Sequence, residues 1–289
     1  MLRCTIAGLT VLMASERYGG MADAFFSTYS EEFAAVVRLE SYYLIRRFPP
    51  PIAAHLLDPV LPGILSRQRP DGLWRKSARI TYDILSAMRR AGDPDPASRL
   101  NHPLPEAIPG ATEPYPVLIK KDILGRFDER DRAAAAELAS AITAEQRKDG
   151  SWEGTVTATS IRLETLLDLG EDADGAAVRR GLAFLYGQWK EELPGIHTRE
   201  PYGLVGRAMF TGADRNAEFL SAQQLRPEWI PRQVCFRTLA VLPNAVCLLL
   251  LLRLGQEGDD RVVCALENLH ALLTEYGGLC ATQIKKPFL

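Results

Sequence analysis

The same seven-residue pattern, Gln-x-x-Asp-Gly-x-Trp, occurs at two places in this chain. It runs from Gln68 to Trp74 and again from Gln146 to Trp152, 78 positions later. Asp-Gly is a strong turn signal, because glycine readily takes the positive φ that a tight reversal requires. In both copies the turn joins segments whose apolar residues recur at helical spacing. A turn that is repeated between helices predicts a fold built from repeated helical hairpins.

The residues of the pattern are expected to fasten consecutive helices together. A glutamine six positions before a tryptophan can hydrogen-bond backbone groups at helix ends, and the indole ring offers a large surface for burial. We therefore expect both tryptophans to be buried in the turns, beside the glutamines. The residues to which this structural role is assigned are Gln68, Asp71, Gly72, Trp74, Gln146, Asp149, Gly150 and Trp152.

Weaker copies of the pattern follow along the chain. Gln223 to Trp229 keeps the Gln-to-Trp spacing but has Arg-Pro in place of Asp-Gly, and Thr274 to Cys280 keeps only the Gly-Leu centre. Gln188 ends another apolar helical segment without a turn of this kind. These anchors fit a unit of about 40 residues, the length of two helices and two turns, if a copy near position 107 has decayed.

The pattern resembles the QW repeat of the terpenoid-cyclase and protein-prenyltransferase superfamily, which contains squalene–hopene cyclases and protein prenyltransferase β subunits. The resemblance runs from about Pro51 to Cys280. It implies an all-α fold in which about six helical pairs, some of them degenerate, close into an α/α toroid around an apolar cavity. We expect residues 1–30 to be a leader or a disordered N-terminus, and residues 31–289 to form a single α/α toroid domain.

In this superfamily the inner helices begin after each QW turn, so the first turns of those helices are candidate binding positions. Polar side chains at the starts of apolar helices suit the mouth of a ligand site, and helix N-termini favour an anion such as diphosphate. The alternative is that these side chains cap helices or face water. The residues that the resemblance implies as substrate-binding are Tyr82, Thr157, His197, Arg199, Tyr202 and Cys235.

Asp83 is the candidate catalytic residue. Ile84 and Leu85 follow it on the segment after the first turn, and an apolar surrounding raises the pKa of a carboxyl group and keeps its proton available. Arg79, four residues earlier, would stabilise the carboxylate instead. The alternative for Asp83 is therefore an ion pair with Arg79 on the helix surface.

The superfamily's usual catalytic clusters are missing. The chain lacks the Asp-x-Asp-Asp motif that donates a proton and the Asp-Asp-x-x-Asp cluster that holds Mg²⁺. A zinc site of Asp83, His197 and Cys235 would require all three side chains to converge within about 2.0–2.3 Å of one point. No cofactor is assigned from the sequence, and zinc and magnesium stay open.

Composition narrows the classes of partner and the setting. The net charge of −2, with scattered basic residues, gives no case for nucleic acid. The five cysteines lack CxxC spacing, which favours a reducing, cytoplasmic setting; residues 4–14 form a short apolar run that is a weak signal for secretion. No apolar stretch reaches the ~20 residues of a transmembrane helix.

Two functions remain open at this point. The first is an enzyme that handles an isoprenoid or another apolar substrate, including an isoprenoid diphosphate, in the toroid cavity. The second is a non-catalytic α/α toroid that binds a ligand or acts as a scaffold. The proline-rich segment 93–116 stands where a turn is missing, and it is either a lid or a decayed repeat.

Overall fold

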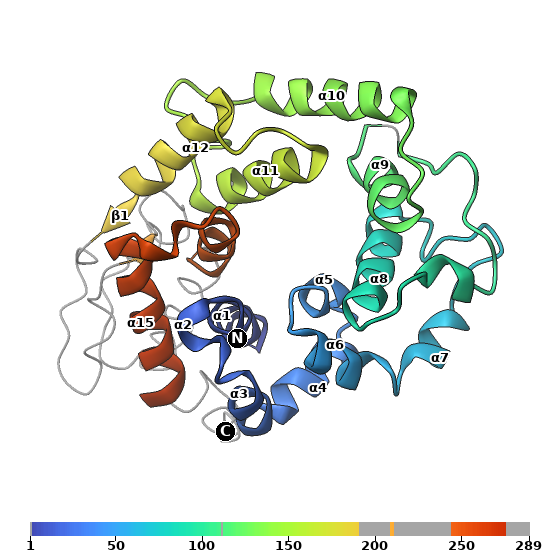
Figure 1. Ribbon diagram of the computed structural model, residues 1–289, viewed down its shortest axis with the longest axis horizontal. Helices are drawn as coiled ribbons and strands as arrows, with labels where there is room; N and C mark the ends of the chain where they lie inside the picture. The colour runs from blue at the N-terminus through green and yellow to red at the C-terminus, as the bar shows by residue number, and fades with distance from the viewer. Residues whose placement is uncertain (1, 111, 191–208, 211–243, 276–289) are drawn as a thin grey trace, which may run out of the picture. The chain divides into compact units, whose positions relative to one another are not determined.

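The computed structural model describes residues 2–110, 112–190, 209–210 and 244–275, and helices dominate these residues (Figure 1). The strands of the described chain are one antiparallel pair of two residues each, β1 (Trp189–Lys190) and β2 (Met209–Phe210). The predicted all-helical class is therefore confirmed. The chain divides into two compact units, of which unit 1 comprises residues 1–25, 145–164 and 172–289, and unit 2 comprises residues 26–144 and 165–171.

Unit 2 is organised around helix α8 (Ala78–Arg90), which packs against α5 (Tyr42–Ile45), α6 (Pro50–Leu57) and α9 (Tyr115–Leu118). Ser77 begins α8, because its hydroxyl accepts a hydrogen bond from the backbone N–H of Ile80. The buried face of α8 carries apolar residues at helical spacing. The remaining elements of unit 2 are α4 (Ser30–Arg38), α7 (Leu61–Leu65), the short 3₁₀ helix η1 (Pro96–Arg99), the π-helical turn η2 (Ile119–Ile123) and α10 (Glu129–Ala144).

Unit 1 is built around α1 (Leu2–Ala14) and α15 (Asp260–Glu275), which pack against each other. Their contact is close, since a Cβ atom on Gly8 would meet the side chain of Leu269 at 3.0 Å. The other elements of unit 1 are α2 (Glu16–Gly19), α12 (Ala176–Gly187), a helix over residues 244–253 and η5 (Gln256–Gly258). Helices α3 (Ala22–Thr28) and α11 (Val156–Leu169) contribute residues to both units.

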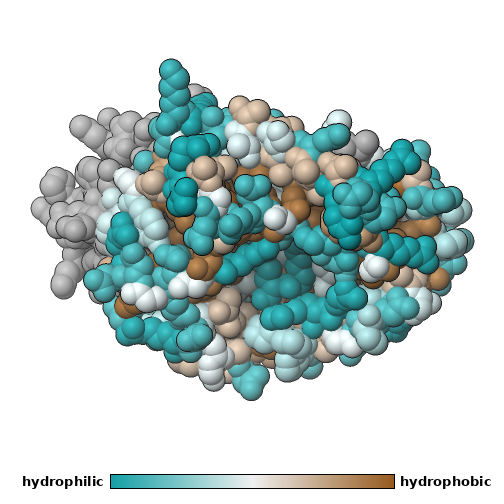
Figure 2. Space-filling view, turned by 45° about the horizontal axis from the view of Figure 1, so that its top comes forward, coloured by the Kyte–Doolittle hydropathy of each residue, from teal (hydrophilic) through white to brown (hydrophobic). Residues whose placement is uncertain are grey.

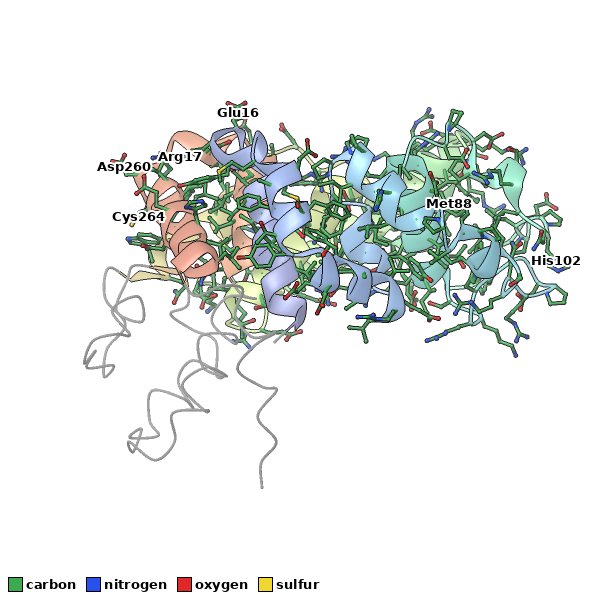
Figure 3. The ribbon with its side chains drawn as sticks, turned by 90° about the horizontal axis from the view of Figure 1, so that it is seen from below. Glu16, Arg17, Met88, His102, Asp260 and Cys264 are labelled. Carbon is green, nitrogen blue, oxygen red and sulfur yellow. The ribbon has the colours of Figure 1, made fainter. Side chains whose placement is uncertain are left out.

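Residues 2–28, which lie in the segment 1–30 expected as a leader or a disordered N-terminus, form helices α1, α2 and α3. The apolar run in α1 is buried, with Ile6 and Leu9 fully inaccessible to solvent. The carboxylate of Glu257 accepts hydrogen bonds from the backbone N–H groups of Glu16 and Arg17 at the start of α2. Figure 3 shows Glu16 and Arg17 beside Asp260, at the start of α15. Burial against the rest of unit 1, which the sequence pattern does not reveal, explains why the apolar run forms helix α1.

The spacing of apolar residues predicts one helix over residues 31–47, but the structure breaks this segment into α4 and α5. Glu40 lies at the break with a φ of 52°, and its carboxylate pairs with the guanidinium groups of Arg67 and Arg75. Apolar residues at helical spacing also predict helices over residues 77–91, 128–146, 157–169 and 176–188, and the structure confirms these four to within two residues. The same spacing predicts helices over 200–211 and 214–224. Both segments, and the weak copy at Gln223 to Trp229, lie outside the described residues.

Hydrophilic residues cover most of the face shown in Figure 2, with apolar residues exposed between them. Large apolar side chains that remain exposed in the described chain are Met21, Leu39 and Ile161. Across the described ranges, no helix combines the length and apolar character needed to cross a bilayer. Most large apolar side chains of the described residues are thus buried in the cores of the two units.

Candidate functional site

The first copy of the repeated turn lies in unit 2 and is packed as predicted. Trp74 is 4% exposed, and its indole N–H donates to the carbonyl of Ile64 at 2.9 Å. The Gln68 amide donates to the carbonyls of Gly72 (2.9 Å) and His102 (2.7 Å), and its oxygen accepts from the backbone N–H of His102. The buried glutamine therefore joins the turn to a segment 34 residues further along the chain.

The second copy lies in unit 1 and repeats this arrangement. Trp152 is 1% exposed. The Gln146 amide donates to the carbonyls of Gly150 and Ala177, both at 2.9 Å, and its oxygen accepts from the guanidinium of Arg180 at 2.6 Å. The predicted burial of both tryptophans beside their glutamines is confirmed, and the shared hydrogen bonds make the two turns equivalent.

The aspartates of the two patterns stabilise the turns locally. The Asp71 carboxylate accepts from the backbone N–H of Leu73, and the Asp149 carboxylate accepts from the backbone N–H and the hydroxyl of Ser151. The hydrogen bond from Leu73 holds the pKa of Asp71 below its ordinary value, and the Ser151 hydroxyl does the same for the pKa of Asp149. Both carboxylates are therefore turn residues.

A threonine seven positions after each tryptophan completes the turn, and the sequence analysis missed it. The Thr81 hydroxyl accepts from the backbone N–H of Trp74 at 3.2 Å, and the Thr159 hydroxyl accepts from that of Trp152 at 3.0 Å. The two threonines are 78 positions apart, like the glutamines. Extending the comparison of the two copies into the following helix would have found them.

The proline-rich segment 93–116 takes the place of a helix start at the first turn. Gly72 packs against the backbone of Pro103, just as Gly150 packs against the backbone of Arg180 in α12. His102 accepts from Gln68 as Ala177 accepts from Gln146, and Figure 3 shows His102 at the outer edge of the ribbon. His102 and Pro103 therefore occupy, at the first turn, the positions that Ala177 and Arg180 occupy at the second.

Asp83 lies on α8 and is 8% exposed, so the alternative of a surface ion pair is wrong. Its carboxylate lies 3.6 Å from Nε of Arg46, which comes from the end of α5. Burial raises the pKa of Asp83 above its ordinary value, while the positive charges of Arg46, Arg79 and Arg47 act in the opposite direction. The raised pKa of Asp83 agrees with the desolvation that its apolar neighbours in the sequence predict.

The raised pKa links Asp83 to stability in a defined sense. A carboxyl group whose pKa is higher in the folded protein binds its proton more tightly there than in the unfolded chain. The stability that this proton contributes is fully present below the ordinary pKa of 3.8, and it is lost as the pH rises through the higher value of the folded state. The folded protein thus favours the uncharged acid more than the unfolded chain does.

Two tyrosine rings lie against the same arginines that act on this carboxyl group, Arg46 and Arg79. The hydroxyl of Tyr82, which is 6% exposed, donates to Asp122 on η2 at 2.7 Å, and burial followed by the charge of Asp122 raises the pKa of Tyr82. The Tyr82 and Tyr115 ring centroids are 6.0 Å apart. The guanidinium carbon of Arg46 lies 5.1 Å from the Tyr82 centroid, and that of Arg79 lies 5.9 Å from the Tyr115 centroid. The site is therefore a buried acid flanked by aromatic rings and guanidinium groups.

The other predicted binding residues are not brought to this group. Thr157 lies in the first turn of α11, in unit 1, and is partly buried. The remaining four, His197, Arg199, Tyr202 and Cys235, lie outside the described residues. The hypothetical zinc site therefore also lies outside them, because it would need His197 and Cys235. Within the described ranges no three His, Cys, Asp or Glu side chains come together as ligands for a metal ion.

Comparisons of the chain with models of known families, with curated proteins and with solved structures gave no significant match. The functional argument therefore rests on the residues of the chain and their geometry.

Proposed function

We propose that this protein is a terpenoid cyclase- or prenyltransferase-like enzyme that acts on an isoprenoid or another apolar substrate. We propose further that its helical hairpins close into an α/α toroid whose central cavity receives that substrate. The repeated Gln-x-x-Asp-Gly-x-Trp turns, with their equivalent hydrogen bonds, support the toroid. The single observation that carries the activity is the buried Asp83 carboxyl beside Tyr82 and Tyr115.

Asp83 would act as a general acid. Burial disfavours the carboxylate and raises the pKa of Asp83, and the protonated group would give its proton to a weakly basic carbon or oxygen of the substrate. Proton transfer to an apolar substrate creates positive charge, and tyrosine ring faces stabilise a cation within about 6 Å. The Tyr82 and Tyr115 centroids already lie 5.1 Å and 5.9 Å from the guanidinium carbons of Arg46 and Arg79, so a substrate cation would compete with these groups for the rings.

The Tyr82–Asp122 hydrogen bond would hold one of these rings in place. Asp122 is fixed on the π-helical turn η2, and such turns often occur at functional sites. The ligand that we propose is an apolar small molecule, with isoprenoid diphosphates included in the class. No metal is assigned to the reaction. A cytoplasmic setting is proposed because the cysteines lack disulfide or metal spacing.

One observation favours the second function, a non-catalytic binding or scaffold protein. Arg46 lies within 3.6 Å of Asp83, and a buried carboxylate with a cationic partner is also a common structural element. In that case the pair fastens α5 to α8, and the carboxyl group carries no chemistry.

Replacing Asp83 separates the two functions. We expect Asp83→Asn to lower turnover of farnesyl diphosphate, geranylgeranyl diphosphate or squalene by about 10²–10⁴-fold, the usual contribution of a general acid. Turnover is measured by chromatography of the products, and circular dichroism checks the fold. The matched control is Asp58→Asn, an exposed aspartate at the end of α6, which should turn over substrate like the parent.

Two results would count against the enzyme. If the parent converts none of these substrates, the assignment to this chemistry fails. If Asp83→Asn keeps turnover within about threefold of the parent, general acid catalysis by Asp83 is excluded, because the loss would be smaller than any such contribution.

A further inference from the structure

We infer that a pocket in unit 2, which Asp83 does not line, binds a small amphipathic carboxylate. The pocket has a volume of 720 Å³ and lies between the segment 97–108 and residues 120–131. Volumes of about 300–1,000 Å³ are typical of sites for small molecules. This inference does not depend on the proposed function, because Asp83 and its neighbours do not line the pocket.

The pocket is formed by the segment that replaces a helix of the repeat. At the second turn, α12 buries Val178 and Leu185 as a continuous apolar face. At the first turn the equivalent position is taken by irregular backbone with prolines at 103 and 105. Such backbone has no continuous apolar stripe to fill the space beside its neighbours. A pocket at this place follows from the decayed repeat.

The irregular wall is fixed at its base. His102 exchanges two hydrogen bonds with the Gln68 side chain, and the Asn101 amide donates to the carbonyl of Leu65 at 2.8 Å. A wall held in this way gives the pocket a defined shape before a ligand arrives, which lowers the cost of ordering on binding.

The lining offers an apolar surface to the body of a ligand. Its apolar side chains come from both walls and include Leu100, Leu104, Ile108, Leu124 and Phe127. All but Ile108 are only partly buried in the protein, so a ligand could remove more of their surface from water. Removing this apolar surface from water would stabilise the complex.

The lining carries three carboxylates, Glu106, Asp128 and Asp131, and two cations, Lys120 and Arg126, so the donors that an anion would use are those of the two cations. The ammonium of Lys120 donates to Asp131 at 2.6 Å, which uses one of its three N–H groups. Both carboxylate oxygens of the buried Asp131 already accept hydrogen bonds, one from Lys120 and one from the backbone of Asp128. The Asp128 carboxylate in turn accepts from the backbone N–H of Asp131. Lys120 therefore keeps two N–H groups that can donate to a ligand, and Asp131 keeps acceptor sites of its own.

Arg126 adds a second cation from the same turn. Its backbone N–H donates to the carbonyl of Lys120 at 3.0 Å, so the two cationic side chains start from neighbouring points. Among the described residues Arg126 forms no ion pair within 4.0 Å, and its side chain is exposed. One further carboxylate of the lining, Glu106, is also exposed to water. Lys120 and Arg126 together can receive a carboxylate while the apolar walls receive the rest of the molecule.

The inference is tested with a carboxylate and an alcohol that share one apolar body. Naphthaleneacetate and naphthaleneethanol are titrated into the purified full-length protein and followed by calorimetry. The parent should bind the carboxylate more tightly than the alcohol. Arg126→Gln should weaken binding of the carboxylate about fivefold, the value of one exposed ion pair of about 1 kcal/mol, and leave the alcohol unchanged. Leu104→Trp, which fills the pocket, should weaken binding of both.

Two control variants locate the binding. Arg130→Gln removes an exposed cation near the pocket that does not line it, and Asp83→Asn alters the proposed catalytic residue. Both variants should bind naphthaleneacetate like the parent. Unchanged binding by Asp83→Asn would show that the pocket binds its ligand whether or not Asp83 is catalytic. The inference is overturned if the parent fails to bind the carboxylate at millimolar concentration. It is equally overturned if Arg126→Gln or a folded Leu104→Trp binds it as tightly as the parent.

Discussion

Truncating Trp152 to alanine should lower the free energy of unfolding by about 3–5 kcal/mol, the usual cost of removing a packed aromatic side chain. Trp152 is among the largest side chains that are fully buried, and its backbone N–H is fixed by Thr159. The substitution leaves a cavity in the turn that joins α10 to α11. Because the first turn is built in the same way, Trp74→Ala should lower stability by a similar amount.

Urea denaturation followed by circular dichroism measures both effects. The control is Met21→Ala, since Met21 is 40% exposed and its truncation should change stability by less than about 0.5 kcal/mol. A loss below about 1 kcal/mol for Trp152→Ala would mean that the turn is not packed, and the equivalence of the two turns would then have no energetic basis.

Gly150→Ala should be the second large effect, with a loss of more than about 2 kcal/mol. Gly150 has a φ of +88°, a conformation that residues with a Cβ atom rarely adopt. An added Cβ atom would also overlap the backbone carbonyl of Arg180, which cannot move aside like a flexible side chain. Strain and overlap therefore act together at this position.

The matched control for this change is Gly187→Ala, at the end of α12. A Cβ atom there meets nothing within 4 Å, and the backbone does not require glycine. Thermal unfolding should show Gly187→Ala equal to the parent or slightly more stable. If the two alanine variants unfold at the same temperature, the close approach between the turn and α12 is not a source of stability.

The turns could be predicted from the sequence because their determinants are local. Asp-Gly fixes the reversal, and the glutamine and tryptophan lie within seven positions of each other. The hydrogen-bond partners of the glutamines could not be predicted from the sequence in the same way. That Gln68 would bond His102, in a segment without helical periodicity, follows only from the fold.

The candidate site shows the same limit. The sequence predicts desolvation of Asp83 from its apolar neighbours, and the direction of its pKa agrees. The local rule for helices also offered Arg79 as an ion-pair partner. In the structure the guanidinium of Arg79 lies over the Tyr115 ring, and Arg46 pairs with Asp83 from α5, 37 positions upstream. Contacts between elements far apart in the chain leave no periodic signal.

Native mass spectrometry of the full-length protein tests the proposed handling of isoprenoids most directly. The protein is measured as purified from cells and again after incubation with farnesyl diphosphate, geranylgeranyl diphosphate or squalene. We predict a mass increment that corresponds to one bound isoprenoid. The increment should disappear when the protein is denatured before the measurement. A protein that keeps its bare mass in every one of these measurements would contradict the account.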